Sequence, residues 1–222
     1  MINKVLKNRN GFTLIEVLVA MVLSIIIMAA IYSTYYSQQK SYIVQEQVAA
    51  MQQNLRAATF FMEREIRMAG CDPTRHAGAG ITVANATSIS FTEDTDGDGT
   101  LTNITYALFM DTDGVKKLGR ASGAVYVPVA DNIEVLNFIY LDGASPPNVL
   151  NDPMTNNVLA VRLPDIRSVE VTVVAKTAIE DRTYTDTNNY YNQRGTNILA
   201  APNDYYRRKL LSTSIKCRNQ GL

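Results

Sequence analysis

An acidic residue, Glu16, lies inside a long apolar stretch near the start of the chain. The twenty residues from Phe12 to Ile31 contain no other charge. A carboxylate in an apolar membrane segment is costly and rare, and it is usually retained for a partner of opposite charge. An ordinary secretory signal also follows basic residues, but it carries no acid in its core, and no A-x-A-like cleavage site is present here. Glu16 is therefore predicted to have a specific pairing role.

An aspartate-rich segment is the second candidate for chemistry. Asp94, Asp96 and Asp98 alternate with other residues, and a glycine occupies the sixth position. This matches the start of a calcium loop, in which oxygens at alternate positions converge on the ion. The twelfth position holds a threonine instead of a bidentate glutamate, and Asp-Gly pairs also favour tight turns between strands. A plain turn is the favoured interpretation, and a calcium site completed by Asp111 and Asp113 is the alternative.

The remaining reactive side chains form no recognisable catalytic pattern. His76 is the only histidine, and the sequence has no G-x-S-x-G, HExxH or phosphate-loop motif. Two cysteines, Cys71 and Cys217, are too few for a disulfide framework or a four-thiolate zinc site. They form one disulfide if the domain faces an oxidising compartment, or they stay free thiols, and both alternatives are open. We expect no enzymatic activity and, apart from calcium, no cofactor.

The charge of the chain is balanced overall but uneven at its start. The 222 residues include 21 basic and 21 acidic side chains, which gives no indication of nucleic-acid binding. Residues 1–11 contain Lys4, Lys7 and Arg9 and no acid. By the positive-inside rule this flank stays in the cytoplasm, so the bulk of the chain is expected outside it. The length suits one globular domain with an appendage.

Residues 12–31 form the first half of a predicted long helix. Twenty predominantly apolar residues at about 1.5 Å per residue span a ~30 Å hydrocarbon core, so this segment is expected to cross a membrane. Tyrosines follow it at positions 32, 35, 36 and 42. An aromatic belt at the membrane–water boundary is the favoured interpretation of these tyrosines, and stacking between subunits is the alternative.

Residues 32–70 continue the helix as an amphipathic segment. Neither glycine nor proline interrupts it before Gly70, which offers a C-terminal cap, and Pro73 prevents continuation. Apolar residues recur at spacings of four and three and define one stripe: Val44, Val48, Met51, Leu55, Ala58 and Met62. This stripe is expected to face the core of a globular domain.

Residues 71–222 change to a period of two, which predicts half-buried strands separated by turns. The alternating sets are Ile89 and Phe91; Ile104, Tyr106 and Leu108; Leu136, Phe138 and Tyr140; Val169, Val171 and Val173; and Leu211, Thr213, Ile215 and Cys217. Two polar stretches, 142–157 and 181–204, are expected to be exposed, mobile loops. A helix packed on antiparallel strands is an α+β fold.

The segment Gly11-Phe12-Thr13-Leu14-Ile15-Glu16 resembles the processing motif of type IV prepilins and type II secretion pseudopilins. The resemblance implies that residues 1–11 are a leader, which a prepilin peptidase removes between Gly11 and Phe12 before it methylates the Phe12 amine. It also implies that Glu16 pairs with the N-terminal amine of a neighbouring subunit. The partners that the resemblance implies for this chain are other pilin subunits and an inner-membrane assembly platform. It also implies that the globular domain lies in the periplasm before the subunit joins a pilus or pseudopilus.

Three further segments look like the W-type minor pilins (PilW), which are similar to the J-type pseudopilins of type II secretion. They are the helix end at 60–71, a strand at 133–140 and the C-terminal run 207–219. This resemblance implies a low-abundance subunit that helps to initiate pilus assembly at the filament tip. The alternatives are a J-type pseudopilin and, from another class, a membrane-anchored periplasmic binding domain that never polymerises.

Overall fold

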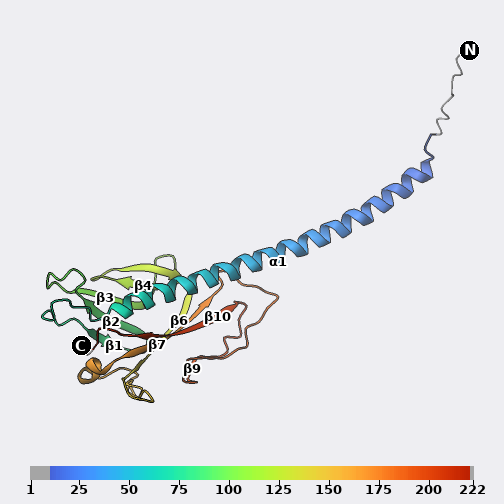
Figure 1. Ribbon diagram of the computed structural model, residues 1–222. Helices are drawn as coiled ribbons and strands as arrows, with labels where there is room; N and C mark the ends of the chain where they lie inside the picture. Colours follow the sequence, from blue (N-terminus) through green and yellow to red (C-terminus); the bar gives the residue numbers. More distant parts are fainter. Residues whose placement is uncertain (1–10, 221–222) are drawn as a thin grey trace, which may run out of the picture. The chain divides into compact units, whose positions relative to one another are not determined.

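The computed structural model describes residues 11–220, so residues 1–10 of the predicted leader lie outside the described part of the chain. The chain divides into two compact units, Met1–Glu46 and Gln47–Leu222. A single helix, α1 (Leu14–Met68), contributes to both. Its bounds differ by two residues or fewer from the predicted helix, and the ten strands that follow it belong to the second unit (Figure 1). The predicted α+β fold is confirmed.

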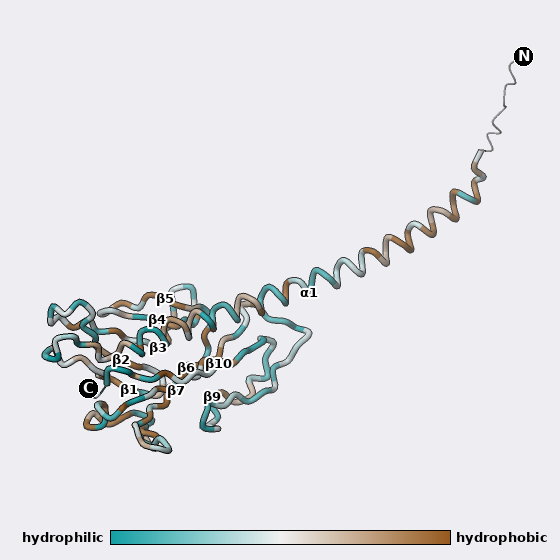
Figure 2. Tube along the Cα trace, in the orientation of Figure 1, coloured by the Kyte–Doolittle hydropathy of each residue, from teal (hydrophilic) through white to brown (hydrophobic). Residues whose placement is uncertain are grey.

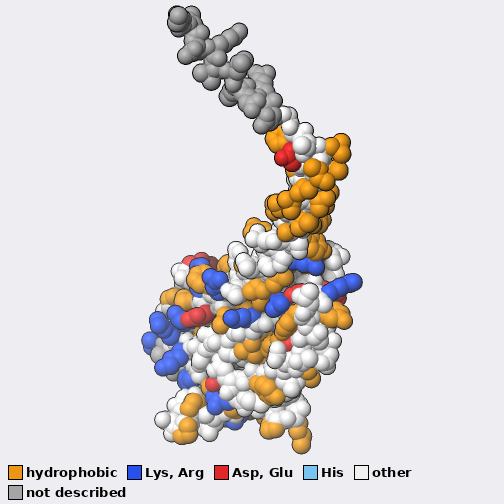
Figure 3. Space-filling view, turned by 90° about the vertical axis from the view of Figure 1, so that its right-hand side faces the viewer, with side chains coloured by type: hydrophobic (Ala, Val, Ile, Leu, Met, Phe, Trp, Pro, Cys, Tyr) orange, Lys and Arg blue, Asp and Glu red, His pale blue; other side chains and the backbone are white. Residues whose placement is uncertain are grey.

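The part of α1 in the first unit is apolar and exposed. Figure 2 colours much of its trace brown, for hydrophobic residues, and Figure 3 shows its hydrophobic side chains in orange. The helix is long and apolar enough to cross a membrane by length and composition. Three of its hydroxyls are bonded within the helix, because those of Ser24, Thr34 and Ser41 each donate to a backbone carbonyl four residues earlier. Such internal bonding is what a lipid environment requires.

The part of α1 in the second unit carries the predicted apolar stripe into the core. Met51, Leu55, Ala58 and Met62 are at most 4% exposed, and Val48 packs against them. The helix stops where the sequence predicts, because Gly70 adopts a φ of 78°. Only glycine enters this left-handed region without steric cost, so Gly70 ends the helix.

A five-stranded antiparallel sheet has the strand order β1-β2-β3-β4-β5. Its strands are β1 (Ile81–Ala84), β2 (Ser88–Glu93), β3 (Thr102–Met110), β4 (Lys116–Ala121) and β5 (Tyr126–Asp131). The alternating residues of β2 and β3 point into the core as predicted. Strands β4 and β5 were not predicted, because their sequences KKLGRA and YVPVAD lack a clear period of two. Edge strand β5 contains Pro128, which has no N–H to offer a further strand.

A three-stranded antiparallel sheet has the order β10-β7-β6. Its strands are β6 (Ile133–Leu141), β7 (Ser168–Lys176) and β10 (Arg208–Lys216), and a 3₁₀ helix, η1 (Ala160–Asp165), precedes β7. One hydrophobic core joins side chains of both sheets to those of α1. The predicted inward residues of β6 and β7 are all in this core, among them Phe138 and Val171, which have no exposed surface.

Residues 177–207, named here the β7–β10 connection, are mostly exposed over the predicted loop 181–204, but two buried polar residues, Asp186 and Asn192, anchor them to the domain. They contain β8 (Tyr190–Tyr191) and β9 (Asn197–Leu199), and they cover the second face of the three-stranded sheet. On that face of β7, Glu170 and Thr172 are at most 9% exposed, and Arg194 donates to both carboxylate oxygens of Glu170 at 3.0 and 2.8 Å. The polar connection therefore packs on the face of β7 that carries Glu170 and Thr172. From the alternation of residues alone, this face would be expected to contact solvent.

Candidate functional site

Glu16 and Thr13 form a capping box at the N-terminus of α1. The Thr13 N–H and the Thr13 hydroxyl both donate to Glu16 Oε2 at 2.8 Å, and the Glu16 N–H donates to Thr13 Oγ1 at 3.4 Å. Reciprocal bonds of this kind satisfy N–H groups that have no partner inside the helix. The sequence analysis missed the role of Thr13, although the T-x-x-E spacing is the recognised signal for it.

The capping box leaves part of the Glu16 carboxylate available. Both bonds from Thr13 end on Oε2, while Oε1 accepts no hydrogen bond from the described residues, and the side chain is exposed. A carboxylate that keeps its charge and one open oxygen can accept an ion pair from an ammonium group. The geometry therefore allows two roles for Glu16, one inside its own helix and one toward a second molecule.

The peptide between Gly11 and Phe12 lies just ahead of the helix. Both residues are outside regular secondary structure, and Phe12 is 89% exposed. A Cβ placed on Gly11 would meet nothing within 4 Å. No described residue therefore blocks the approach of a protease to this bond. No packing contact among the described residues requires a glycine at position 11. Cleavage of the bond remains a prediction.

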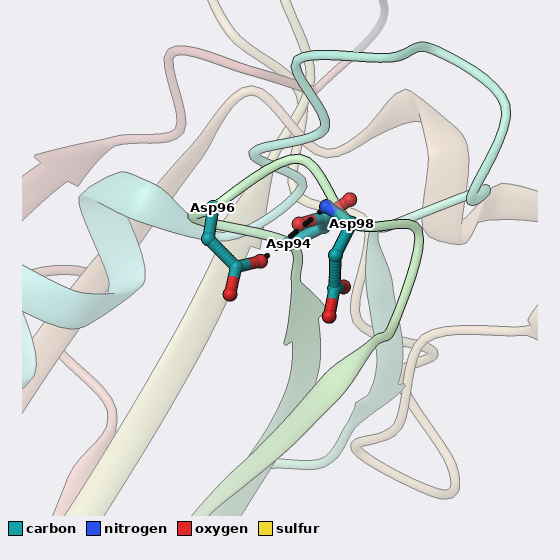
Figure 4. Close-up of side chains that lie close together, drawn as sticks. All are labelled: Asp94, Asp96 and Asp98. Carbon is teal, nitrogen blue, oxygen red and sulfur yellow. Dashed lines mark hydrogen bonds between the residues drawn. The ribbon is translucent and has the colours of Figure 1, made fainter.

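The aspartate segment 94–99 is a turn organised around Asp94. Asp94 is 1% exposed, and its two oxygens accept the N–H groups of Gly97 at 2.7 Å and Gly99 at 3.0 Å. Asp96 and Asp98 are exposed, and the Asp98 N–H contacts the Asp96 carboxylate at 3.5 Å (Figure 4). Oxygens of all three carboxylates lie within 4.8 Å of one another, a spacing that could hold a cation. The bonds of Asp94 nevertheless account for its burial without an ion.

Asp111 and Asp113 do not complete this cluster, which corrects the prediction for them. Both bind Lys117, whose Nζ lies 2.8 Å from Asp111 and 2.7 Å from Asp113, with Asp131 at 3.6 Å. The reason is the hairpin that joins β3 and β4. It brings Lys117, four residues after Asp113, over the turn, and its ammonium lowers the pKa of both aspartates.

Cys71 and Cys217 are free thiols in the structure, which is one of the two alternatives that the sequence left open. Cys217 is 4% exposed, within the core, and burial raises the pKa of its thiol to about 12. Cys71 is partly exposed just beyond the end of α1, and its N–H donates to Met68. The two cysteines therefore occupy different environments, one dry and one open to solvent.

His76 has a local role. Its Nδ1 contacts the Thr74 carbonyl oxygen at 2.5 Å, and the ring is exposed. Among the described residues no carboxylate or nucleophile is bonded to it. The arrangement that general acid–base or nucleophilic catalysis needs is therefore not assembled around this histidine.

An ion cluster around Arg208 was not predicted. The guanidinium is 1% exposed and binds the carboxylates of Glu134, Asp186 and Asp204, with 2.5 Å to Glu134 Oε2 and 2.6 Å to Asp204 Oδ1. Asp186 has no exposed surface and also accepts the Tyr190 hydroxyl at 2.7 Å. The cluster fastens the β7–β10 connection to β6 and β10.

A second unpredicted ion pair joins α1 to the five-stranded sheet. Arg120 Nε lies 2.8 and 2.9 Å from the two carboxylate oxygens of Glu65, and the Tyr106 hydroxyl donates to the same carboxylate at 2.7 Å. Burial, together with the nearby charge of Glu65, raises the pKa of Tyr106 well above its ordinary value. No sequence spacing relates these three residues, so only the fold reveals them.

Comparison with known proteins identifies the N-terminal segment. Residues 6–32 match the family model described as the prokaryotic N-terminal methylation motif. The prediction of a prepilin-type N-terminal motif is thereby confirmed. No curated protein gives a significant match. A solved structure, a type IV-like pilin (TTHA1219) from Thermus thermophilus, is similar with a TM-score of 0.49 and 13% identity, over 76% of this chain and 97% of that one.

Proposed function

Because residues 6–32 carry the prokaryotic N-terminal methylation motif, we propose that this chain is a type IV pilin-like subunit that assembles into a filament. The observation that carries the proposal is the single carboxylate, Glu16, held at the start of an exposed apolar helix. In a monomeric membrane anchor Glu16 serves only to cap its own helix, a role that needs no charge, because glutamine fits the capping box as well. In a filament, the same charge finds an ammonium partner on a neighbouring subunit.

The proposed processing precedes assembly. A prepilin peptidase cuts between Gly11 and Phe12, removes the basic residues 1–11 and methylates the new amine of Phe12. That amine and Glu16 then form an ion pair between two subunits, which offsets the cost of placing each charge in apolar surroundings. Before assembly the apolar helix is held in the bacterial inner membrane, and the domain faces the periplasm.

The geometry at Thr13 and Glu16 shows how to test this pairing. Glu16→Ala removes both the charge and the capping box, whereas Glu16→Gln removes the charge and keeps the box, since glutamine also fits its third position. Glu46→Gln, which alters the other acid in the first unit, is the matched control. Each variant replaces the native copy, and sheared filaments are compared with membranes by immunoblotting.

We expect all three variants to be cleaved after Gly11. Glu16→Ala and Glu16→Gln should enter filaments at least tenfold less than the native chain, and Glu46→Gln should enter normally. If Glu16→Gln assembles as well as the native chain while Glu16→Ala does not, capping is the only role of Glu16. Normal assembly of both variants would favour a membrane-anchored periplasmic domain that does not polymerise.

Within the filament, we propose the role of a W-type minor pilin that helps to initiate assembly at the tip. The second candidate is a J-type pseudopilin, supported by the same N-terminal motif and by the resemblance of residues 60–71, 133–140 and 207–219 to both groups. An in-frame deletion distinguishes them. Reduced piliation with intact exoprotein secretion supports the minor pilin, whereas blocked secretion with normal pili supports the pseudopilin.

We also propose that the protein is structural and not an enzyme. Three of its reactive groups have internal roles or surroundings: His76 contacts its own turn, Cys217 is buried, and Lys117 binds aspartates. For Asp94, Asp96 and Asp98 we retain the turn as the favoured interpretation and calcium as the alternative. The other pilin subunits, the prepilin peptidase and the inner-membrane platform are the proposed partners.

A further inference from the structure

Strand β10 is an edge strand of the three-stranded sheet, because β7 is its only paired neighbour among the described strands. The bonds beyond its two ends show which way its backbone points. The Thr177 N–H donates to the Arg207 carbonyl at 2.9 Å, and the Cys217 N–H donates to the Arg167 carbonyl at 2.9 Å. Bonded and non-bonded positions alternate in an antiparallel pair, so the odd-numbered residues of β10 bond to β7 and the backbone groups of the even-numbered residues point away from it.

The outward backbone groups of β10 are open. The N–H and C=O groups of Leu210, Ser212 and Ser214 form no hydrogen bond with a described residue. Arg208 shows the same exposure: its side chain is 1% exposed, yet the residue as a whole is partly exposed, so the surface that reaches solvent is its main chain. These outward positions offer donors and acceptors to an added strand.

A hollow of about 140 Å³ lies between β10 and α1. Lys209 and Leu211 form its β10 side, and Gln52, Leu55 and Arg56 form its α1 side. No residue of β7 lines it, so it lies on the open side of β10. An added strand places every second side chain on the face that carries the odd-numbered residues, and the side chain opposite Leu211 has this hollow to fill.

The open edge is positively charged. After Asp204 the sequence contains no acid and five basic residues: Arg207, Arg208, Lys209, Lys216 and Arg218. The first two are paired with acids inside the domain. The other three are exposed and, like Arg56 in the wall of the hollow, form no ion pair with a described residue. Cations without partners therefore stand at both ends of the strand.

These charges disfavour a second copy of β10 as the occupant. Antiparallel pairing of two copies about Ser212 sets Lys216 opposite Arg208, and like charges opposite each other destabilise a sheet. Lysine on an edge strand prevents such self-pairing. An acidic strand is favoured instead. Lys209 and Lys216 are seven positions apart, roughly 23 Å along a strand, so acids seven positions apart in an added strand meet both of them.

We propose that β10 binds an extended acidic segment of a partner protein, which adds antiparallel to the open edge as a fourth strand of the sheet. Its backbone bonds to Leu210, Ser212 and Ser214, an apolar side chain fills the hollow beside Leu211, and two acids meet Lys209 and Lys216. The inference is independent of the filament role, because all of these residues belong to the second unit and the binding requires neither processing nor assembly.

The probe is a fluorescein-labelled peptide of sequence DVTVTVTE. Paired as proposed, its last residue lies opposite Lys209 and its first lies opposite Lys216. In this register its odd-numbered positions bond to the edge, and its valines lie on the face of the hollow. Binding to the full chain in a non-ionic detergent is measured by fluorescence anisotropy, and we expect it to be saturable.

Backbone methylation of the peptide separates strand addition from attraction between charges alone. N-methylation of its third and fifth residues removes two N–H groups that bond to the edge, so it should weaken binding at least about tenfold. N-methylation of the second and fourth residues changes groups that point away from the edge, so it should leave binding nearly unchanged. Both peptides keep all charges. Equal binding of the two methylated peptides, or no binding of the parent peptide, overturns the proposal.

Variants of the chain test the same edge from the other side. Ser214→Pro removes an outward N–H that has no partner among the described residues, so it should weaken binding at least about tenfold, whereas Ser214→Ala keeps this N–H and should bind as the native chain does. Thermal unfolding checks that both variants fold. Native-like binding by a folded Ser214→Pro chain contradicts strand addition.

The charges are tested with Lys209→Gln and Lys216→Gln. Each should weaken binding about two- to fivefold, as expected for exposed ion pairs. Arg182→Gln, an exposed arginine elsewhere that forms no ion pair with a described residue, is the control and should have no effect. Undiminished binding by a chain with both lysines replaced overturns the assignment of an acidic partner.

Discussion

Replacement of Arg208 by methionine is the sharpest test of how the second unit is held together. The Arg208 side chain is 1% exposed, and it binds Glu134 on β6 together with Asp186 and Asp204 in the β7–β10 connection. Methionine fills most of the same volume but carries no charge. The substitution therefore leaves Asp186, which has no exposed surface, without its cation.

The size of the effect follows from this burial. Removal of one partner of a buried ion pair typically costs about 3–5 kcal/mol, because the other charge stays in the interior. Asp186 keeps its bonds to Tyr190 at 2.7 Å and to the Asn188 side chain at 3.0 Å, so we expect the lower end of this range, about 3 kcal/mol. For a domain of this size that corresponds to a fall in Tm of roughly 6–12 °C.

The assay is thermal and urea unfolding of the full chain in detergent, with Arg182→Met as the matched control. Arg182 is an exposed arginine of the same connection, and it forms no ion pair with the described residues. We expect the control to change the free energy of unfolding by less than about 0.5 kcal/mol. Hydrogen exchange should accelerate first in residues 177–207 of the Arg208→Met variant, since these residues lose their attachment.

The pH dependence provides an independent check. Burial by itself raises the pKa of Asp186, but bonds from Tyr190, Asn188 and Arg208 outweigh it and hold the pKa below the ordinary 3.8. For Asp204, the Arg208 guanidinium is the main cause of a lowered pKa. A carboxyl with a lowered folded-state pKa stabilises the fold above its unfolded pKa, and this stability is lost as the pH falls through the folded-state value.

The difference in stability between the native chain and Arg208→Met should therefore be constant near neutral pH and shrink below pH 3.8. A loss of less than about 1 kcal/mol at neutral pH would refute the reasoning, because a buried charge without a partner cannot be that inexpensive. A difference that stays the same in acid would show that packing, and not charge, accounts for the loss.

Three further predictions concern the core, the thiols and the turn. Met62→Ala should lower the free energy of unfolding by about 2–5 kcal/mol, because Met62 has no exposed surface, whereas Arg64→Ala on the exposed side should cost far less in the same urea titration. In the folded protein at pH 8, Cys71 should be alkylated and Cys217 should not, and both should react after denaturation; failure of both to react without a reductant would show that they are disulfide-bonded. Calcium at several times the ~1 mM Kd of weak extracellular sites should leave the Tm unchanged, and an increase that Asp98→Asn removes would establish a calcium site.

Local patterns predicted the parts of this protein that depend on near neighbours in the chain. The spacing of Met51, Leu55 and Met62 places them on one side of a helix whatever that helix packs against, and all three are buried. Gly70 ends the helix because no other residue takes its φ of 78° at low cost. The T-x-x-E spacing of Thr13 and Glu16 also indicates the capping box, which depends on residues three positions apart.

Patterns without a clear period were harder to interpret. Strand β4, KKLGRA, has a charged residue at each end of its apolar centre and becomes a strand through its pairing with β3 and β5. The β7–β10 connection was expected to be exposed because it is polar. Its Arg194 binds Glu170, 24 residues away, and its Asp186 and Asp204 bind Arg208 of β10, which also binds Glu134, 74 residues away.

By itself, the sequence determined the N-terminal motif, the apolar and amphipathic halves of α1, and the α+β class, because each follows from the identity and spacing of residues close together in the chain. Only the tertiary structure decided which charges meet. It placed Lys117 over Asp111 and Asp113, buried Arg208 among three carboxylates, kept Cys71 and Cys217 as separate thiols, and brought Gln220 between Gly70 and Gly80. The physical reason is that ion pairs and cavities depend on distances through space, and residues far apart in the chain come close only after the sheets and the helix have packed.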